Sequence, residues 1–273
     1  MHTMNKVAKV TLLFWIMKIA ATTLGETGGD LLSMTLNVGY AVSSLILLGF
    51  FLVTLFIQLG VSKYHPVIYW LVIVSTSTAG TTMSDYMDRS LGLGYTAGTL
   101  ILVSGLIIIL ATWRYSQGTL SVNNIRTTKA ETFYWVAILF SNTLGTALGD
   151  FLADSSGLGF LGGAILIASL LALVVLLYYF TSISRIVLFW IAFVLTRPFG
   201  ATFGDVLTKP IARGGLNLGT IGSSIVLASI LVFFVVLATT QEKRVEEGKP
   251  YSGPLPPARK REHIELEPAH QHR

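Results

Sequence analysis

Four aspartates recur at the same place in a repeated pattern, and they are the residues whose chemistry is easiest to interpret. Each lies 15 residues after a tryptophan, and a glycine lies 10 residues after the same tryptophan. The four sets are Trp15, Gly25 and Asp30; Trp70, Gly80 and Asp85; Trp135, Gly145 and Asp150; and Trp190, Gly200 and Asp205. Carboxylates without sulfur or imidazole neighbours favour hard cations such as H⁺, Na⁺, Mg²⁺, Mn²⁺ or Ca²⁺. We therefore expect the aspartates to bind a cation, and the tryptophans and glycines to be structural.

Other polar residues share a helix face with these aspartates. Positions 7, 11 and 15 after each tryptophan fall on one stripe of a helix. The stripe adds these candidate ion-binding residues: Glu26, Thr81, Thr146 and Asn142. Glu26, present only in the first repeat, joins the four aspartates as a candidate metal ligand. Arg197 is the stripe's only arginine or lysine. Because an unpaired arginine within a membrane is costly, we expect Glu26 or an aspartate of another repeat to pair with it.

A structural explanation of the aspartates stays open beside the functional one. Each follows a small residue, so each could mark a helix break and cap the start of a short helix.

We expect Lys18 to extend its charged end to the membrane interface. Asp88 and Asp154 are expected to be solvated in outer loops.

The stripe requires long helices to carry it. Hydrophobic residues make up 52% of the 273 residues and charged residues only 12%, which is about half the charge of a soluble domain. We expect eight apolar segments, each long enough to cross a membrane, near 9–30, 39–60, 66–85, 94–115, 129–150, 159–180, 186–207 and 217–240. Backbone groups in lipid must be satisfied internally, so the predicted fold is an all-α polytopic membrane protein. The chain has no cysteine, which excludes disulfides and thiolate metal sites.

The repeats set the predicted organisation. The tryptophans are spaced 55, 65 and 55 residues apart, so the chain divides into two four-helix halves. We expect halves at 1–115 and 129–240, a cytoplasmic linker at 116–128 and a disordered cytoplasmic tail at 241–273. Each repeat holds two helices and starts from the same side, so the four parallel repeats imply a pseudo-symmetry axis along the membrane normal. Glycines 39, 94, 159 and 219 are expected to turn the chain, and the fourth turn carries five extra residues around Ile211–Gly215.

This plan resembles an uncharacterised bacterial membrane-anchored family. That family is built from four tandem repeats, each with two transmembrane helices and a characteristic tryptophan. The likeness covers about residues 9–240. It implies the architecture and a bacterial source, but no activity.

The positive charges predict how the chain is oriented. Of the 19 lysines and arginines, 14 fall on the side that holds both termini and the linker. By the positive-inside rule, both termini are expected to be cytoplasmic in a bacterial inner membrane. The net charge of +5 is thus a topology signal, and we expect no nucleic-acid partner. The predicted partners are the lipid bilayer and a small ion; homo-oligomerisation stays open.

Three functions fit these features. The first is transport of a small hard cation, either a divalent metal such as Mn²⁺ or Mg²⁺ or a Na⁺- or proton-coupled process, through the repeated intramembrane carboxylates. The second is a non-catalytic membrane scaffold or sensor. The third is an intramembrane aspartyl-type enzyme, which is disfavoured by four equivalent aspartates and the lack of a Gly-x-Gly-Asp motif. We expect a transporter with no enzymatic activity and no cofactor other than the transported cation.

Overall fold

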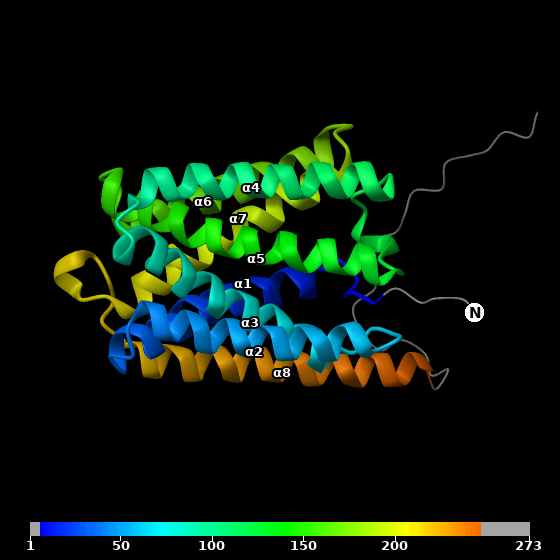
Figure 1. Cartoon of the computed structure of the whole chain (residues 1–273), viewed down its shortest axis with the longest axis horizontal. Coiled ribbons are helices and arrows are strands. Elements are labelled where there is room, and N and C mark those ends of the chain that lie inside the picture. The colour runs from blue at the N-terminus through cyan, green and yellow to red at the C-terminus, as the bar shows by residue number, and fades with distance from the viewer. Residues whose placement is uncertain (1–5, 247–273) are drawn as a thin grey trace, which may run out of the picture. The chain divides into compact units, whose positions relative to one another are not determined.

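The computed structural model describes residues 6–246, and this part of the chain is all-helical, without strands. Its long helices are α1 (Leu12–Asp30), α2 (Tyr40–Gly60), α3 (Pro66–Asp85), α4 (Gly94–Gln117), α5 (Thr128–Asp150), α6 (Gly159–Phe180), α7 (Arg185–Thr208) and α8 (Thr220–Glu246). Short π-helical turns follow three of them: η1 (Leu31–Thr35), η2 (Tyr86–Ser90) and η4 (Phe151–Ser155). Two 3₁₀ turns, η3 (Val122–Asn124) and η5 (Ile211–Arg213), lie in the longer connections. The eight helices match the eight predicted segments closely (Figure 1).

Local chemistry explains where several helices begin. Thr11 and Thr127 accept hydrogen bonds from the backbone at the starts of α1 and α5, and Pro66 occupies the first turn of α3. Glycines before or at the starts of α2, α4, α6 and α8 have positive φ angles between 67° and 80°, which confirms the predicted turns at positions 39, 94, 159 and 219. Helix α8 continues to Glu246, six residues further than expected. The rest of the predicted disordered tail lies outside the described residues.

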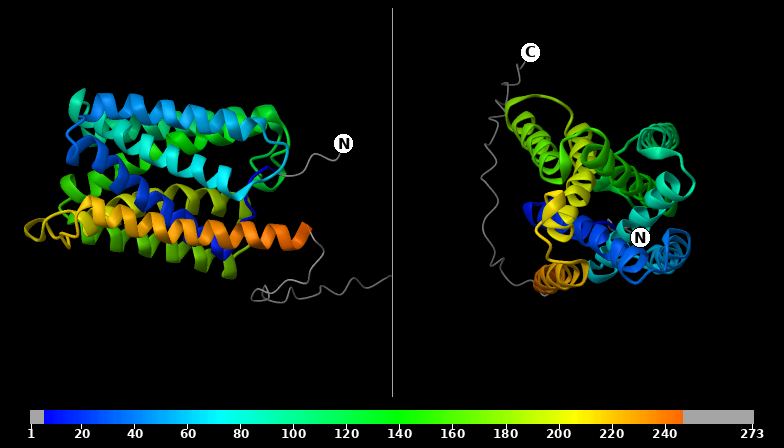
Figure 2. Two further views of the ribbon diagram at one scale, coloured as in Figure 1. Left: turned by 90° about the horizontal axis from the view of Figure 1, so that it is seen from below. Right: turned by 90° about the vertical axis from the view of Figure 1, so that its left-hand side faces the viewer.

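The odd-numbered helices form a closed inner ring. Helix α1 contacts α3 and α7, and α5 contacts the same two helices on the opposite side. The even-numbered helices lie outside this ring, as the end-on view of Figure 2 shows. Each packs on the first helix of the next repeat: α2 on α3, α4 on α5 and α6 on α7. Helix α8 returns to α1, where Ser224 donates a hydrogen bond of 2.9 Å to Thr27.

Glycines fix the register of the ring. A Cβ added at any of four glycines would overlap the next inner helix, so the backbones approach closely there. The contacts are Gly25 with Ser77, Gly80 with Asn142, Gly145 with Arg197, and Gly200 with Thr22. In every case position 10 after one tryptophan meets position 7 after the next. The same contact therefore recurs four times around the ring, which gives the inner helices an approximate four-fold arrangement.

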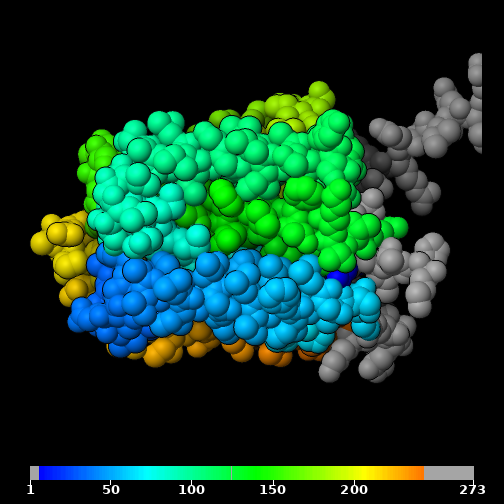
Figure 3. Space-filling view, in the orientation of Figure 1, coloured from blue at the N-terminus to red at the C-terminus, as the bar shows by residue number. Residues whose placement is uncertain are grey.

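The outer helices present an apolar surface. Within residues 6–246, six helices are long and apolar enough to cross a membrane: α2, α4, α5, α6, α7 and α8. In the outer helices only 22% of the apolar window is buried, against 67% in α5 and 50% in α7. Exposed leucine, isoleucine and phenylalanine side chains cover α2 and α4, which dominate the face shown in Figure 3. A surface of this kind is stable in lipid and identifies a multi-pass membrane protein. Helices α1 and α3 are not among the six; both carry polar side chains toward the ring interior.

Both predicted four-helix halves fall within one compact unit. The described residues up to Thr239 form this unit, and the described part of the second unit, from Thr240, is the end of α8. The contact between α1 and α7 closes the ring in the same way as that between α3 and α5.

Candidate functional site

A column of polar side chains runs through the inner ring. The predicted stripe residues Glu26, Thr81, Thr146 and Asn142 are all buried, as are the four aspartates and Arg197. They come from four different helices and converge because the glycine contacts hold equivalent positions at similar heights. The structure thus brings the predicted candidates into one interior, in which three groups can be distinguished.

Glu26 and Arg197 form the central group. Both terminal nitrogens of Arg197 lie 3.1 Å from Oε2 of Glu26, which confirms the predicted pairing. Arg197 also donates to the hydroxyl groups of Thr81 and Thr146, at 2.7 Å in the second case. Two backbone carbonyls, those of Thr22 and Ser77, each lie 3.4 Å away. The arginine therefore contacts all three other helices of the ring, and its full burial is balanced by many acceptors.

Lys18 lies nearer the tryptophan end and corrects one expectation. Its side chain does not reach an interface; it is fully buried. The ammonium group lies 4.1 Å from the centre of the Phe193 ring and 3.5 Å from Oδ1 of Asn142. Asn142 in turn donates to Thr76 at 2.9 Å. Lys18 points into the ring because position 3 after the tryptophan faces the axis, and a cation–π contact partly replaces water there.

The four aspartates form the third group, at the other end of the ring, and they are paired by two cations. Lys209 Nζ lies 2.6 Å from Oδ2 of Asp30 and 3.1 Å from Oδ1 of Asp205. Arg89 lies 3.2 Å from Oδ1 of Asp85 and 3.0 Å from Oδ2 of Asp150. Each cation thus joins the aspartate four residues before it to the aspartate of the following repeat.

Sequence reasoning missed Arg89 and Lys209. The signal that could have found them is their shared position, 19 residues after the tryptophan in the second and fourth repeats. On a helix this is one turn beyond the aspartate. Two tyrosines, Tyr40 and Tyr95, also accept hydrogen bonds from Arg89, at 3.0 and 3.1 Å.

Lys209 stays charged in this arrangement. Burial acts to lower its pKa, but the nearby carboxylates of Asp205 and Asp30 outweigh burial and hold that pKa above the ordinary value for lysine. Among the described residues, the column contains five carboxylates and four cations: Glu26, Asp30, Asp85, Asp150 and Asp205 against Lys18, Arg89, Arg197 and Lys209. If all are ionised, one negative charge is in excess.

Three of the carboxylates can share an ion. Glu26, Asp30 and Asp205 each offer an oxygen, and these oxygens lie within 4.8 Å of one another. Oxygen-only donors suit hard cations such as Mg²⁺, Mn²⁺ and Ca²⁺. Oδ1 of Asp205 is buried and accepts no hydrogen bond, although the lysine ammonium is close. Asp85 and Asp150 are outside this group, so the geometry groups three of the five predicted metal ligands.

The helix-cap explanation of the aspartates does not fit. Asp30, Asp85 and Asp150 have helical backbone angles, and none of their side chains caps a following helix. The chain passes directly into a π-helical turn in each case. Such turns are frequent at functional sites. Asp205 lies within α7, three residues before the helix ends at Thr208.

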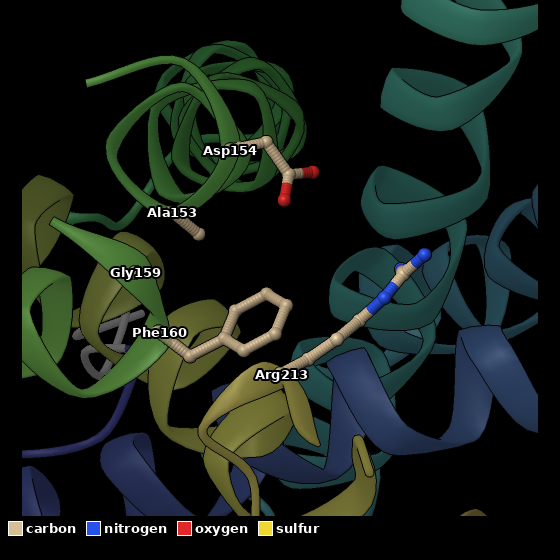
Figure 4. Close-up of a pocket in the computed structure, with 5 residues that line it drawn as sticks. All are labelled: Ala153, Asp154, Gly159, Phe160 and Arg213. Carbon is tan, nitrogen blue, oxygen red and sulfur yellow. The ribbon is translucent and has the colours of Figure 1, made fainter. Parts of the chain in front are cut away.

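The outer-loop aspartates differ from one another. Asp88, expected to be solvated, is buried in η2, where it accepts a hydrogen bond of 3.4 Å from Ser84. It packs against Gly98 of α4, which explains why water is excluded. Asp154 is exposed, as expected. It borders a hollow of about 460 Å³, lined also by Phe160 and Arg213 (Figure 4). None of the five buried carboxylates of the column lines this hollow.

Aromatic residues close the tryptophan end of the ring. The hydroxyl groups of Tyr69 and Tyr134 lie 2.5 Å apart, and Trp70, Trp135 and Trp190 are buried beside them. Beyond this layer, Lys6 pairs with the fully buried Glu131 at 2.6 Å. Gln58 donates to the same carboxylate at 2.9 Å. The tryptophans therefore act as packing residues. Aromatic packing closes this end of the ring, whereas ion pairs close the aspartate end.

Comparison with known proteins places this architecture in a family. No curated protein and no solved structure matches the chain. The model of a Repeat of Unknown Function (DUF347) matches four times, over residues 13–64, 68–119, 133–184 and 188–244. Each match contains one inner helix and the outer helix that follows it. The chain belongs to the DUF347 repeat family.

Proposed function

We propose that the chain is a transporter for a small hard cation in a bacterial inner membrane. The observation that carries the proposal is the column of buried ionisable groups inside the ring, with three carboxylate oxygens within 4.8 Å of one another. Ionisable groups within a membrane are expensive and usually mark a path for an ion or a proton. Five carboxylates in one interior are more than a stable bundle needs, because apolar side chains would pack there at lower cost.

The same proposal includes eight membrane crossings with cytoplasmic termini. Helices α1 and α3 lie in the ring with α5 and α7, in register with them, so the four inner helices extend through the same depth. The polar side chains of α1 and α3 face the axis of the ring, so they do not prevent these two helices from crossing the membrane. By the positive-inside rule, the basic residues at the tryptophan end support a cytoplasmic location for that end. The aspartates then lie toward the outside.

A closed state with two barriers supports a carrier mechanism. At the cytoplasmic end the barrier is the aromatic layer joined by Tyr69 and Tyr134. At the outer end it is the pairing of Asp30 and Asp205 with Lys209. We expect transport to open these barriers in turn. Alternating movement of the two four-helix halves would separate α1 from α7, while the Arg89 pair keeps α3 and α5 together.

A scaffold or sensor is the second candidate. It is favoured by one observation: every aspartate of the ring has a cationic partner within 3.2 Å. Complete pairing would suit a purely structural role. An aspartyl-type enzyme fits less well, because such a site needs two carboxylates that share a proton, whereas here a cation separates each pair. We expect no enzymatic activity.

Flux measurements in proteoliposomes test the proposal. Purified protein is reconstituted, and uptake of Mn²⁺, Mg²⁺, Ca²⁺, Na⁺ and H⁺ is followed with ion-sensitive dyes. We expect uptake of at least one cation, and at least a tenfold loss in Asp30→Asn and Asp205→Asn. Asp154→Asn is the matched control, because that aspartate is exposed and outside the column, and it should keep wild-type flux. Folded wild-type protein that moves none of these cations would favour the scaffold.

A further inference from the structure

Lys209 differs from every other cation in the column by the way it is held. It follows the last residue of α7 and lies in a loop, whereas Lys18, Arg89 and Arg197 belong to helical segments. The loop contains the five extra residues of the fourth repeat, and it folds back: the backbone N–H of Asn217 donates to the Lys209 carbonyl at 3.0 Å. A Cβ at Gly215 would overlap the Lys209 backbone. The insertion is therefore packed so as to position this lysine.

We propose that Lys209 is a tethered cation that occupies the ion site in the closed state and must leave before a divalent cation can bind to Glu26, Asp30 and Asp205. The inference rests on the proposed function and specifies its substrate class. A lysine ammonium seated between two of these carboxylates shows that their geometry accepts a positive charge. The partly unsatisfied Asp205 carboxylate, whose side chain is only 5% exposed, faces the same point.

The chemistry of lysine and arginine separates the two aspartate pairs. Arg89 is planar and has several donors, and it is fixed by two aspartates and two tyrosines. Lys209 is a point charge on a flexible stem, with two aspartate partners. The Arg89 pair is therefore permanently neutralised and structural. We expect Lys209 to leave its pair, and in the described part of the chain this is the pair with a third carboxylate, Glu26, beside it.

Charge balance then selects the substrate. Glu26 is already matched by Arg197. When Lys209 withdraws, Asp30 and Asp205 leave two uncompensated negative charges, which one divalent cation neutralises.

The fold offers space for this movement. The hollow of about 460 Å³ next to the insertion is lined by Arg213 of the insertion and by Asp154 of η4 (Figure 4). This hollow leaves room for the insertion to move while Lys209 withdraws from the ring.

Mn²⁺ binding to the purified full chain tests the inference independently of transport. Free Mn²⁺ is measured by its electron paramagnetic resonance signal in detergent solution. We expect Lys209→Met to bind one Mn²⁺ at least about tenfold more tightly than the wild type, equivalent to about 1.4 kcal/mol. Arg213→Met is the matched control, because it removes one positive charge from the same insertion without touching the aspartates, and it should stay within about twofold of the wild type. Equal binding by these two variants would overturn the proposal.

Charge-conserving exchanges give a second readout that does not depend on the stability of Lys209→Met. We expect Lys209→Arg to weaken Mn²⁺ binding and uptake at least about tenfold, because a guanidinium is held more firmly. Arg89→Lys should keep both within about twofold. Wild-type behaviour of Lys209→Arg would refute the tethered-cation role while leaving cation transport intact. Tighter Mn²⁺ binding by Lys209→Met without any flux in the wild type would instead support the site and reject the transporter.

Discussion

Removing one partner of the Glu26–Arg197 pair should destabilise the protein more than removing both. In Glu26→Met, the fully buried guanidinium loses the carboxylate that accepts two of its hydrogen bonds at 3.1 Å. In Arg197→Met, the buried carboxylate loses its cation. Breaking a buried pair in this way costs about 3–5 kcal/mol, whereas replacing both partners by apolar side chains of similar size is often nearly neutral.

The structure narrows these magnitudes. In Glu26→Met, Arg197 keeps its contacts with Thr81 and Thr146, so we expect the lower end, about 3 kcal/mol. For a domain of this size that corresponds to a fall in Tm of about 6–12 °C. Arg197→Met should cost about 3–5 kcal/mol because it also leaves both threonines without their donor. The double variant should cost less than either single variant, so its cost should fall short of the sum of the two by at least about 3 kcal/mol.

Thermal unfolding in detergent micelles, followed by tryptophan fluorescence, measures the cycle. Asp154→Asn serves as a control for loss of a carboxylate at an exposed position, and we expect its Tm to change by less than about 2 °C. Costs that simply add in the double variant would refute a direct pair. Single variants that melt within about 2 °C of the wild type would show that the pair is not desolvated as the structure indicates.

Three further predictions concern packing and closure of the ring, each read as a change in Tm or in leak through liposomes. Gly200→Ala places a Cβ against α1 and should cost about 1–3 kcal/mol, whereas Gly222→Ala on α8 meets no neighbouring atom and should not destabilise the protein. Lys6→Met leaves the fully buried Glu131 without its cation and should lower the free energy of unfolding by about 3 kcal/mol. Lys9→Met, at an exposed position, should change that free energy little. Tyr69→Phe removes the hydroxyl contact across the aromatic layer and should cost about 1 kcal/mol. If that layer is the cytoplasmic barrier, the variant should also raise cation leak; an unchanged leak would contradict that role.

Residues that keep the same position in every repeat could be predicted well from the sequence. Helix number, the turns at glycines and the convergence of the aspartates follow from the tryptophan-to-aspartate register, and the structure has each of them. The pairing of Arg197 was predictable for a different reason. A buried arginine needs acceptors, and few carboxylates were available on the stripe.

The interactions between repeats were harder to predict. Lys18 was expected at an interface because it is close to the start of α1, but the rotation of the helix turns it toward the axis. Arg89 and Lys209 looked like ordinary loop cations because nothing in a linear pattern shows which repeat will lie next to which. Only closure of the ring, with α7 beside α1, brings Lys209 to Asp30, 179 residues away in the sequence.

Divergence among the repeats follows the geometry of the ring. Cations four residues after the aspartate occur in alternate repeats, which reduces the four-fold arrangement to two similar aspartate pairs. The two aspartate pairs also differ in the cation that joins them. One pair has an arginine in a helical turn, and the other has a lysine at the start of an insertion. Glu26 and Arg197 add the third difference, and they too lie on the α1 and α7 side. Because Lys209, Glu26 and Arg197 all lie on the α1 and α7 side, the function of the chain should be sought between these two helices.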